Sequence, residues 1–367
     1  MSENHDRSFQ LLEWTLAMRQ LLIALCLAAT NLATAQTPTT THPVTASPPA
    51  GFRVWSGPSP ASGKPLVGAL WYPASGAGAI QPMFDSTIFQ SALVQPGAAI
   101  RPGRWPVVLI SHGFGGHWRS ISWLGAGLAR QGAVVVGVNH PGSTFGDNDM
   151  LRGLNHGSRA NDLKTALDAL LADASIGPHI DAQRIYAAGF SFGGWTALSM
   201  GGLRGDLGAY ARYCAESGHR HCRDIARQRI DLTQLDASTW NRSYRDPRVK
   251  AVAAIDPGLH QGLNASHASD MVGDVLLIGL GLGADRLPDT DFSAHGATLT
   301  SILPKARTEI IAPAFHFSAL AVCKPAGAKL LAEDNDDPVC TDPPGTDRPA
   351  LHEQIVHSMA RHFRLGK

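Results

Sequence analysis

Residues 184–198 read RIYAAGFSFGGWTAL and contain the pattern G-x-S-x-G at positions 189–193. The residues before the pattern predict a strand, and the residues after it predict the start of a helix. A sharp turn between a strand and a helix holds its serine in a strained conformation, and glycines on either side relieve the crowding. This context favours a nucleophile elbow with Ser191 at its tip over a glycine-rich turn with an idle serine.

Predicted strands and helices alternate outward from this motif. Short apolar runs predict buried strands at 107–110, 134–138, 184–188, 249–255, 275–280 and 308–311, with further strands at 52–55 and 66–72. Helices are expected over 120–130, 159–174, 193–200 and 351–363. This repeated alternation predicts the α/β class, with a mostly parallel central sheet flanked by helices on both faces. Residues 203–247 are polar and interrupt the alternation, so we interpret them as an insertion after the nucleophile helix.

A glycine-rich turn follows the predicted strand that ends at Ser111. It reads His112-Gly113-Phe114-Gly115-Gly116, and such glycines let backbone N–H groups approach a substrate oxygen. The expected oxyanion-binding donors are the Phe114 amide and the Phe192 amide, which follows the serine. His112 is expected to hold the turn, because the base of such a site is expected C-terminal to the serine.

The candidate bases lie near the C-terminus. His316 follows the last predicted strand, where a loop can return over the edge of the sheet. His352 and His357 lie on the predicted final helix, which should pack on the outside. We therefore predict that His316 is the general base.

Three aspartates compete for the acid that would orient this base. Asp256 stands at the C-terminal end of the predicted strand 249–255, where ligand-facing positions of open α/β sheets lie. Asp285 and Asp289 follow the next predicted strand and are rivals on position alone.

Together these motifs resemble the bacterial "predicted dienelactone hydrolase" group, which is similar to the platelet-activating-factor acetylhydrolases of the α/β-hydrolase superfamily. The resemblance covers about residues 52–365 and rests on the segments 111–115, 189–194, 255–257 and 316, followed by 340–345. It implies an α/β-hydrolase fold and ester hydrolysis. It also implies that the acid follows the strand after the nucleophile helix, which matches Asp256. Ser191 stands where true dienelactone hydrolases use cysteine, and Phe190 replaces a histidine that often precedes the serine.

The N-terminus predicts export. Residues 21–29 read LLIALCLAA and lie between Arg19 and the small-x-small pattern Ala-Thr-Ala at 33–35. The apolar run is too short to span a membrane, so we predict a signal peptide over residues 1–35, with Met18 as an alternative start. The alternative is a buried N-terminal helix. Residues 36–50 are rich in Thr and Pro and are expected to be a disordered linker.

Composition limits the classes of partner. The formal net charge is +1, so no basic excess points to nucleic acid or to anionic lipid. Hydrophobic residues make up 44% of the chain, enough for a sizeable core over residues 51–367. No phosphate-loop or dinucleotide fingerprint is present, and the histidines of segment 218–222 lack a partner pair for zinc. We therefore expect no cofactor and no metal.

Four cysteines remain after the predicted signal peptide, at positions 214, 222, 323 and 340. An even number in an exported chain predicts two disulfides, for which three pairings are possible. The local pairing, which joins Cys214 to Cys222 and Cys323 to Cys340, closes the shorter loops. The expected location is the periplasm or the outside of the cell.

The sequence thus predicts an exported serine hydrolase that cleaves carboxylic esters, either short-acyl or lipid-like, with Ser191, His316 and Asp256 as a triad. An amidase or peptidase with the same triad is one alternative, and a non-catalytic binding protein on the same fold is another. The insertion is expected to form a partial lid, against the alternative of a remote surface excursion. The acyl-chain length, the alcohol and the oligomeric state stay open.

Overall fold

The computed structural model describes residues 49–59, 63, 65–76, 78–293, 299–334 and 336–366. The predicted signal peptide and all but the last two residues of the predicted linker lie outside them. The first strand already begins at Ala50, the last residue assigned to that linker.

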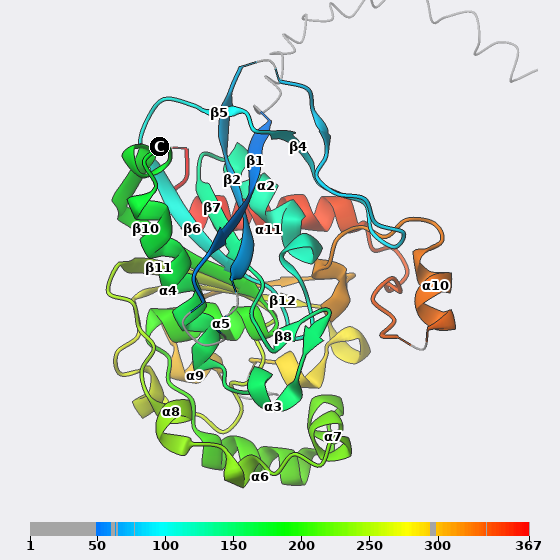
Figure 1. The fold of residues 1–367 in the computed structure, drawn as a ribbon. Coiled ribbons are helices and arrows are strands. Elements are labelled where there is room, and N and C mark those ends of the chain that lie inside the picture. The colour runs from blue at the N-terminus through cyan, green and yellow to red at the C-terminus, as the bar shows by residue number, and fades with distance from the viewer. Residues whose placement is uncertain are drawn as a thin grey trace, which may run out of the picture. The chain divides into compact units, whose positions relative to one another are not determined.

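A mixed sheet forms the centre of the structure (Figure 1). Its strand order is β13-β12-β11-β10-β6-β7-β2-β1-β4-β3, and β5 pairs with β2. Neighbouring strands from β7 to β13 along this order run parallel, whereas β2 runs antiparallel to both β7 and β1. β8 and β9 form a separate two-stranded sheet. The strands are β1 (Ala50–Gly57), β2 (Leu66–Ser75), β3 (Gln81–Pro82), β4 (Leu93–Pro96), β5 (Ala99–Ile100), β6 (Trp105–Ser111), β7 (Val134–Val138), β8 (Ser143–Thr144), β9 (Asp147–Asn148), β10 (Ile180–Phe190), β11 (Val249–Ile255), β12 (Asp274–Leu280) and β13 (Arg307–Ile311).

Every strand that the sequence predicted is present, and the mostly parallel sheet with flanking helices confirms the predicted α/β-hydrolase fold. The short strands β3, β4, β5, β8 and β9 were not predicted, because two to four residues carry too little periodicity to be recognised.

Helices cover both faces of the sheet. The longer ones are α2 (Ser122–Arg130), α4 (Gly157–Ala172), α5 (Phe192–Gly201), α6 (Leu207–Ser217), α7 (Arg220–Arg227) and α11 (Arg348–His362). The shorter ones are α3 (Met150–Gly153), α8 (Ala237–Asn241), α9 (Leu299–Ile302), α10 (Gly327–Glu333), η1 (Trp118–Ile121), η2 (Gly177–His179), η3 (Leu232–Gln234), η4 (Ala265–Ala268), η5 (Gly283–Asp285), η6 (Pro288–Thr290) and η7 (His316–Ala319).

Alternate residues of the central strands feed two separate cores. In β6, Val107 and Leu109 join the cluster beneath α4 and α5, whereas Val108 and Ile110 join the cluster beneath α2 and α11. This alternation is the period-2 geometry of a strand whose two faces are both covered.

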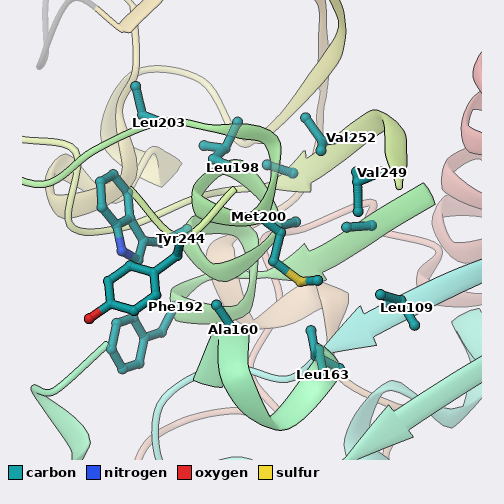
Figure 2. Packing of buried hydrophobic residues seen from close by; sticks show 14 of the residues in the cluster. Leu109, Ala160, Leu163, Phe192, Leu198, Met200, Leu203, Tyr244, Val249 and Val252 are labelled. Carbon is teal, nitrogen blue, oxygen red and sulfur yellow. The ribbon is translucent and has the colours of Figure 1, made fainter. Parts of the chain in front are cut away.

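The insertion is helical, which its polar composition did not predict. It contains α6, α7 and α8. Tyr210, Trp240 and Tyr244 are buried in the α4–α5 cluster and Tyr213 packs against it, whereas most of its polar residues are at least partly exposed. Tyr244 packs so closely on α4 that a Cβ atom at Gly157 would lie 1.8 Å from its ring. Figure 2 shows Tyr244 near Phe192 and Ala160 in this core. The insertion is therefore part of the folded body, at least through its aromatic side.

Two disulfides are present, and both follow the local pairing. Cys214–Cys222 joins α6 to α7, and Cys323–Cys340 closes a loop near α10. Within the described residues, no helix is both long and apolar enough to cross a membrane.

Candidate active site

Ser191 lies at the turn between β10 and α5. Its backbone has φ 57° and ψ −121°, a conformation that non-glycine residues rarely adopt. Such strained conformations occur mainly at functional sites. The flanking glycines are required by space. A Cβ atom at Gly189 would lie 2.2 Å from the carbonyl oxygen of Gly193, and one at Gly193 would lie 1.9 Å from that of Ser111. The turn therefore leaves no room for a side chain at either Gly189 or Gly193, which explains the two glycines of the G-x-S-x-G pattern.

Three of the predicted site residues meet at the carboxyl edge of the sheet. Ser191 follows β10, Asp256 follows β11, and His316 begins η7 shortly after β13. His316 Nε2 lies 3.1 Å from Ser191 Oγ, and His316 Nδ1 lies 2.9 Å from Asp256 Oδ2. The His316 side chain also packs on the Phe190 ring, with ring centroids 4.6 Å apart. The structure thus joins the three residues in one hydrogen-bonded chain.

Asp256 is completely buried and surrounded by donors. Its Oδ1 accepts hydrogen bonds from the Leu280 amide at 2.9 Å and from Arg286 Nη1 at 2.6 Å. Its Oδ2 accepts from the Thr290 hydroxyl at 3.1 Å and from His316. Each carboxyl oxygen thus has two hydrogen-bond partners, which fix the orientation of the carboxyl group.

Sequence reasoning missed Arg286 and Thr290. Their only signal was their place directly after β12, at the same edge of the sheet as the predicted acid.

The rival residues take other places. Asp285 is exposed, and Asp289 accepts a hydrogen bond from the Tyr213 hydroxyl of the insertion at 3.1 Å. His352 stacks on Trp123 and donates through Nε2 to a backbone carbonyl, and burial lowers its pKa to about 4. His357 is exposed on α11. None of these residues belongs to the chain that reaches Ser191.

The two predicted oxyanion-binding amides, those of Phe114 and Phe192, donate no hydrogen bond to any other described residue. The loop that carries the first amide lies against the serine, because a Cβ atom at Gly113 would be 3.3 Å from Ser191 Cβ. The Gly113 carbonyl accepts from His112 Nδ1 at 2.7 Å and from the Gly116 amide at 3.1 Å. In a trans peptide the N–H points opposite to the carbonyl, so the Phe114 N–H is directed away from the His112 ring.

His112 is neutral and holds this turn. A carbonyl only accepts, so Nδ1 carries the proton toward Gly113. A backbone N–H only donates, so Nε2 is the acceptor toward the His140 amide, 3.3 Å away. Burial, together with the nearby Arg159 guanidinium, lowers the pKa of His112 well below its usual range. These contacts match the predicted role of a side chain that holds the turn.

The insertion reaches the same loop. The ring centroid of His221, in α7, lies 6.1 Å from that of Phe114. Among the described residues, no three His, Cys, Asp or Glu side chains are arranged to hold a metal ion.

Comparison with known proteins finds relatives that are named as ester hydrolases. A family model described as PETase, PET hydrolase-like, matches residues 94–226. The chain is 38% identical over 171 residues to "Cutinase est2" of Thermobifida alba, an alignment that covers 44% of this chain and 54% of that protein. It is 31% identical over 153 residues to "Bis(hydroxyethyl) terephthalate hydrolase" of Streptomyces coelicolor, covering 42% of this chain and 46% of that protein. The chain thus spans about half the length of these curated relatives.

A solved structure extends the likeness to most of the fold. The ferulic acid esterase from Streptomyces cinnamoneus superposes with a TM-score of 0.53 at 20% identity, covering 89% of this chain and 92% of that chain. At this identity the superposition shows a shared α/β-hydrolase fold. The comparisons support a likeness to PET hydrolase-like enzymes, and they do not confirm the narrower resemblance to dienelactone hydrolases and platelet-activating-factor acetylhydrolases.

Proposed function

We propose that the protein is a serine hydrolase that cleaves carboxylic esters. The observation that carries this proposal is the hydrogen-bonded chain from Ser191 Oγ through His316 to Asp256, built on a strained turn. In the proposed reaction, Ser191 Oγ attacks the ester carbonyl carbon while His316 Nε2 takes its proton. The same proton then passes to the departing alcohol, which leaves an acyl group on the serine.

The second half of the reaction uses the same groups. A water molecule gives its proton to His316 and attacks the acyl carbonyl, and the carboxylic acid leaves as Ser191 regains a proton. In both halves the carbonyl oxygen gains negative charge, and the Phe114 and Phe192 amides are the proposed donors to it. Asp256 keeps the proton of His316 on Nδ1 and stabilises the imidazolium. Arg286 supports this role by holding the carboxyl in place, with Nη1 2.6 Å from Asp256 Oδ1.

The relatives favour esters over amides as substrates, because several of them are named as cutinases and one as a bis(hydroxyethyl) terephthalate hydrolase. We therefore propose carboxylic esters, short-acyl or lipid-like, as the substrate class, without a cofactor. The narrower likeness to acetylhydrolases stays a proposal within this class. Export to the periplasm or beyond is proposed from residues 1–35 and is supported by the two disulfides, which persist in oxidising compartments.

Labelling with a fluorophosphonate tests the nucleophile. The protein should be labelled once, at Ser191, and Ser191→Ala should lose both labelling and turnover. Parallel assays on a p-nitrophenyl ester series, on bis(hydroxyethyl) terephthalate and on matched anilides then separate an esterase from an amidase. A properly folded protein that is neither labelled nor active on any of these substrates would be a binding protein, and the proposal would be wrong.

The insertion is proposed to cover part of the site. It approaches the oxyanion loop through His221 and the loop after β12 through the hydrogen bond from Tyr213 to Asp289. Its aromatic residues belong to the core, so complete removal would unfold the protein. The substitution His221→Ala is milder and should change the preferred ester chain length, while the exposed His357→Ala should not. An unchanged preference in His221→Ala would favour a remote surface excursion.

A further inference from the structure

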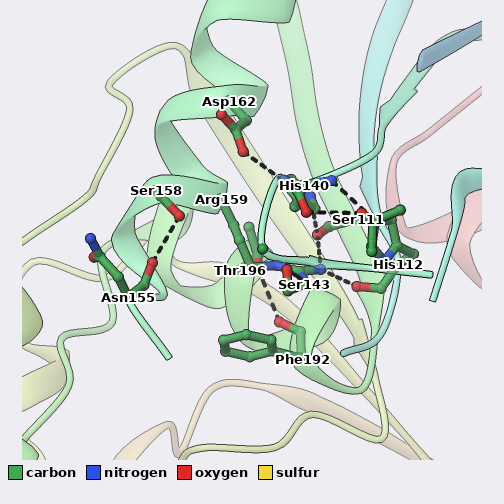
Figure 3. A network of polar contacts seen from close by, with 12 residues as sticks. Ser111, His112, His140, Ser143, Asn155, Ser158, Arg159, Asp162, Phe192 and Thr196 are labelled. Atoms are coloured by element: carbon green, nitrogen blue, oxygen red, sulfur yellow. Dashed lines mark hydrogen bonds and ion pairs between the residues drawn. The ribbon is translucent and has the colours of Figure 1, made fainter. Parts of the chain in front are cut away.

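A completely buried arginine lies behind the proposed oxyanion-binding loop. Arg159 belongs to the first turn of α4 and is 1% exposed. Figure 3 shows its side chain among polar groups from several separate segments. Nε donates to Thr196 Oγ1 at 3.2 Å, and Nη1 donates to Ser143 Oγ at 2.7 Å. Nη2 donates to Ser111 Oγ at 3.0 Å and to the His112 carbonyl. One side chain therefore ties together β6, β8 and α5.

Arg159 acts on the first amide through the turn that His112 begins. Its bond to the His112 carbonyl fixes the peptide that joins His112 to Gly113. The next peptide, whose carbonyl is held by the His112 ring, carries the Phe114 N–H. Two successive peptides are thus held from behind, and the second one exposes an unpaired donor.

Arg159 acts on the second amide through α5. Thr196 Oγ1 accepts from Arg159 and donates to the Phe192 carbonyl at 3.0 Å. The guanidinium carbon also lies 4.6 Å from the centroid of the Phe192 ring. Phe192 is therefore held both at its main chain and at its side chain, beside the amide that follows Ser191.

The chemistry of the site requires a guanidinium. Its planar fork has five N–H donors in fixed directions, whereas a lysine ammonium is a compact group that cannot span the same acceptors. Burying this charge is costly: burial lowers the pKa of Arg159 to about 9. The nearby carboxyl of Asp162 has its pKa raised to about 7, also by burial. A charge retained at such cost in a core position points to a geometric role.

Resting on the proposed function, we propose that Arg159 is the positioning residue that holds the Phe114 and Phe192 amides in register with each other for the developing oxyanion. It touches no substrate atom and acts only through the two peptide groups.

Arg159→Lys and Thr196→Val test this proposal, with an oxygen ester and its thionoester as paired substrates. Sulfur is a weak hydrogen-bond acceptor. The kcat/KM for the oxygen ester divided by that for the thionoester therefore reports how well the two amides donate to the oxyanion. We expect kcat for the oxygen ester to fall about 10- to 100-fold in Arg159→Lys, with KM little changed. This is less than the roughly 100- to 1,000-fold loss for removing one oxyanion donor outright, because the amides are displaced and not removed. The thionoester should be much less affected, so the ratio should fall. Thr196→Val should lower the ratio in the same direction by a smaller factor.

Arg348→Lys is the matched control. Arg348 is also buried, but it holds Asp342, which accepts from Ser318 near the proposed base. Its loss should slow both substrates equally and leave the ratio unchanged. An unchanged ratio in Arg159→Lys, whatever its rate, would overturn the proposal. If Arg159→Lys does not fold, the ratio in Thr196→Val decides alone. Failure of the proposed function is distinct, because the wild-type protein would then hydrolyse neither substrate.

Discussion

Asp256→Asn probes the proposed triad through a single proton. In the structure, Asp256 Oδ1 accepts from the Leu280 amide and from Arg286, both of which can only donate. The amide oxygen of an asparagine must therefore take the Oδ1 position. Its NH₂ group then faces His316 Nδ1, where the carboxylate accepted before.

This orientation gives the wrong tautomer. An NH₂ group facing Nδ1 donates to the lone pair there, so the proton of the imidazole moves to Nε2. His316 Nε2 can then no longer accept the proton of Ser191, 3.1 Å away. Substitutions that impose this tautomer on such triads lower kcat about 10⁴-fold. At roughly 1.4 kcal/mol per factor of ten, the loss corresponds to about 5 kcal/mol of activation free energy.

The assay is the kcat for p-nitrophenyl acetate, with circular dichroism to confirm folding. Asp285→Asn is the control because Asp285 is exposed and outside the hydrogen-bonded chain, so its activity should stay near that of the wild type. Asp289→Asn should be mild, since it weakens only the contact with Tyr213. If Asp256→Asn keeps near-wild-type kcat, the acid has been misassigned and the proposed mechanism fails at that residue.

Three further outcomes are expected. Thiol titration of the denatured, unreduced mature protein should find no free cysteine, and four reactive groups would contradict both disulfides. Gly193→Ala should abolish activity or folding, because its Cβ would lie 1.9 Å from a carbonyl oxygen at the end of β6; Gly258→Ala, with no atom within 4 Å of the added carbon, should be tolerated. Urea unfolding should show stability falling by several kcal/mol per pH unit between about pH 6 and 5. Burial lowers the pKa of His117, His156, His260 and His352 to about 4, and it lowers those of His112 and His140 well below their usual range, so the unfolded chain binds protons first. Each group costs up to about 1.4 kcal/mol per pH unit, and Asp162, with its pKa raised to about 7, opposes one of them. A midpoint that rises on acidification would contradict this last expectation.

The central sheet was predictable because its strands are buried on both faces. Runs such as residues 107–110 and 134–138 are uniformly apolar, which is typical of strands in a parallel sheet covered by helices on both faces. The meeting of Ser191, Asp256 and His316 at one edge of the sheet was predictable for a related reason. Each follows a predicted strand, and the carboxyl ends of parallel strands share one edge of the sheet.

The helices of the insertion and the residues that hold Asp256 were not predictable in the same way. In residues 203–247 a few buried aromatics, such as Tyr210 and Trp240, anchor helices among many polar and charged residues. This overall composition is typical of a loop. Arg286 and Thr290 contact Asp256 only because the loop after β12 folds back over it. The spacing of residues in the sequence does not indicate that this loop folds back. The contacts of Arg286 and Thr290 with Asp256 are therefore visible only in the three-dimensional structure.

The structure contains a second hydrogen-bonded series of a serine, a histidine and an aspartate. It shows why distances alone do not define an active site. Ser111 Oγ lies 2.9 Å from His140 Nε2, and His140 Nδ1 lies 3.0 Å from Asp162. Yet Ser111 is fully buried, sits in regular strand backbone, and accepts a hydrogen bond from Arg159. Its oxygen therefore has no access to a substrate. Ser191 differs in its strained backbone and in the unpaired amides close to it, and these features make it the proposed nucleophile.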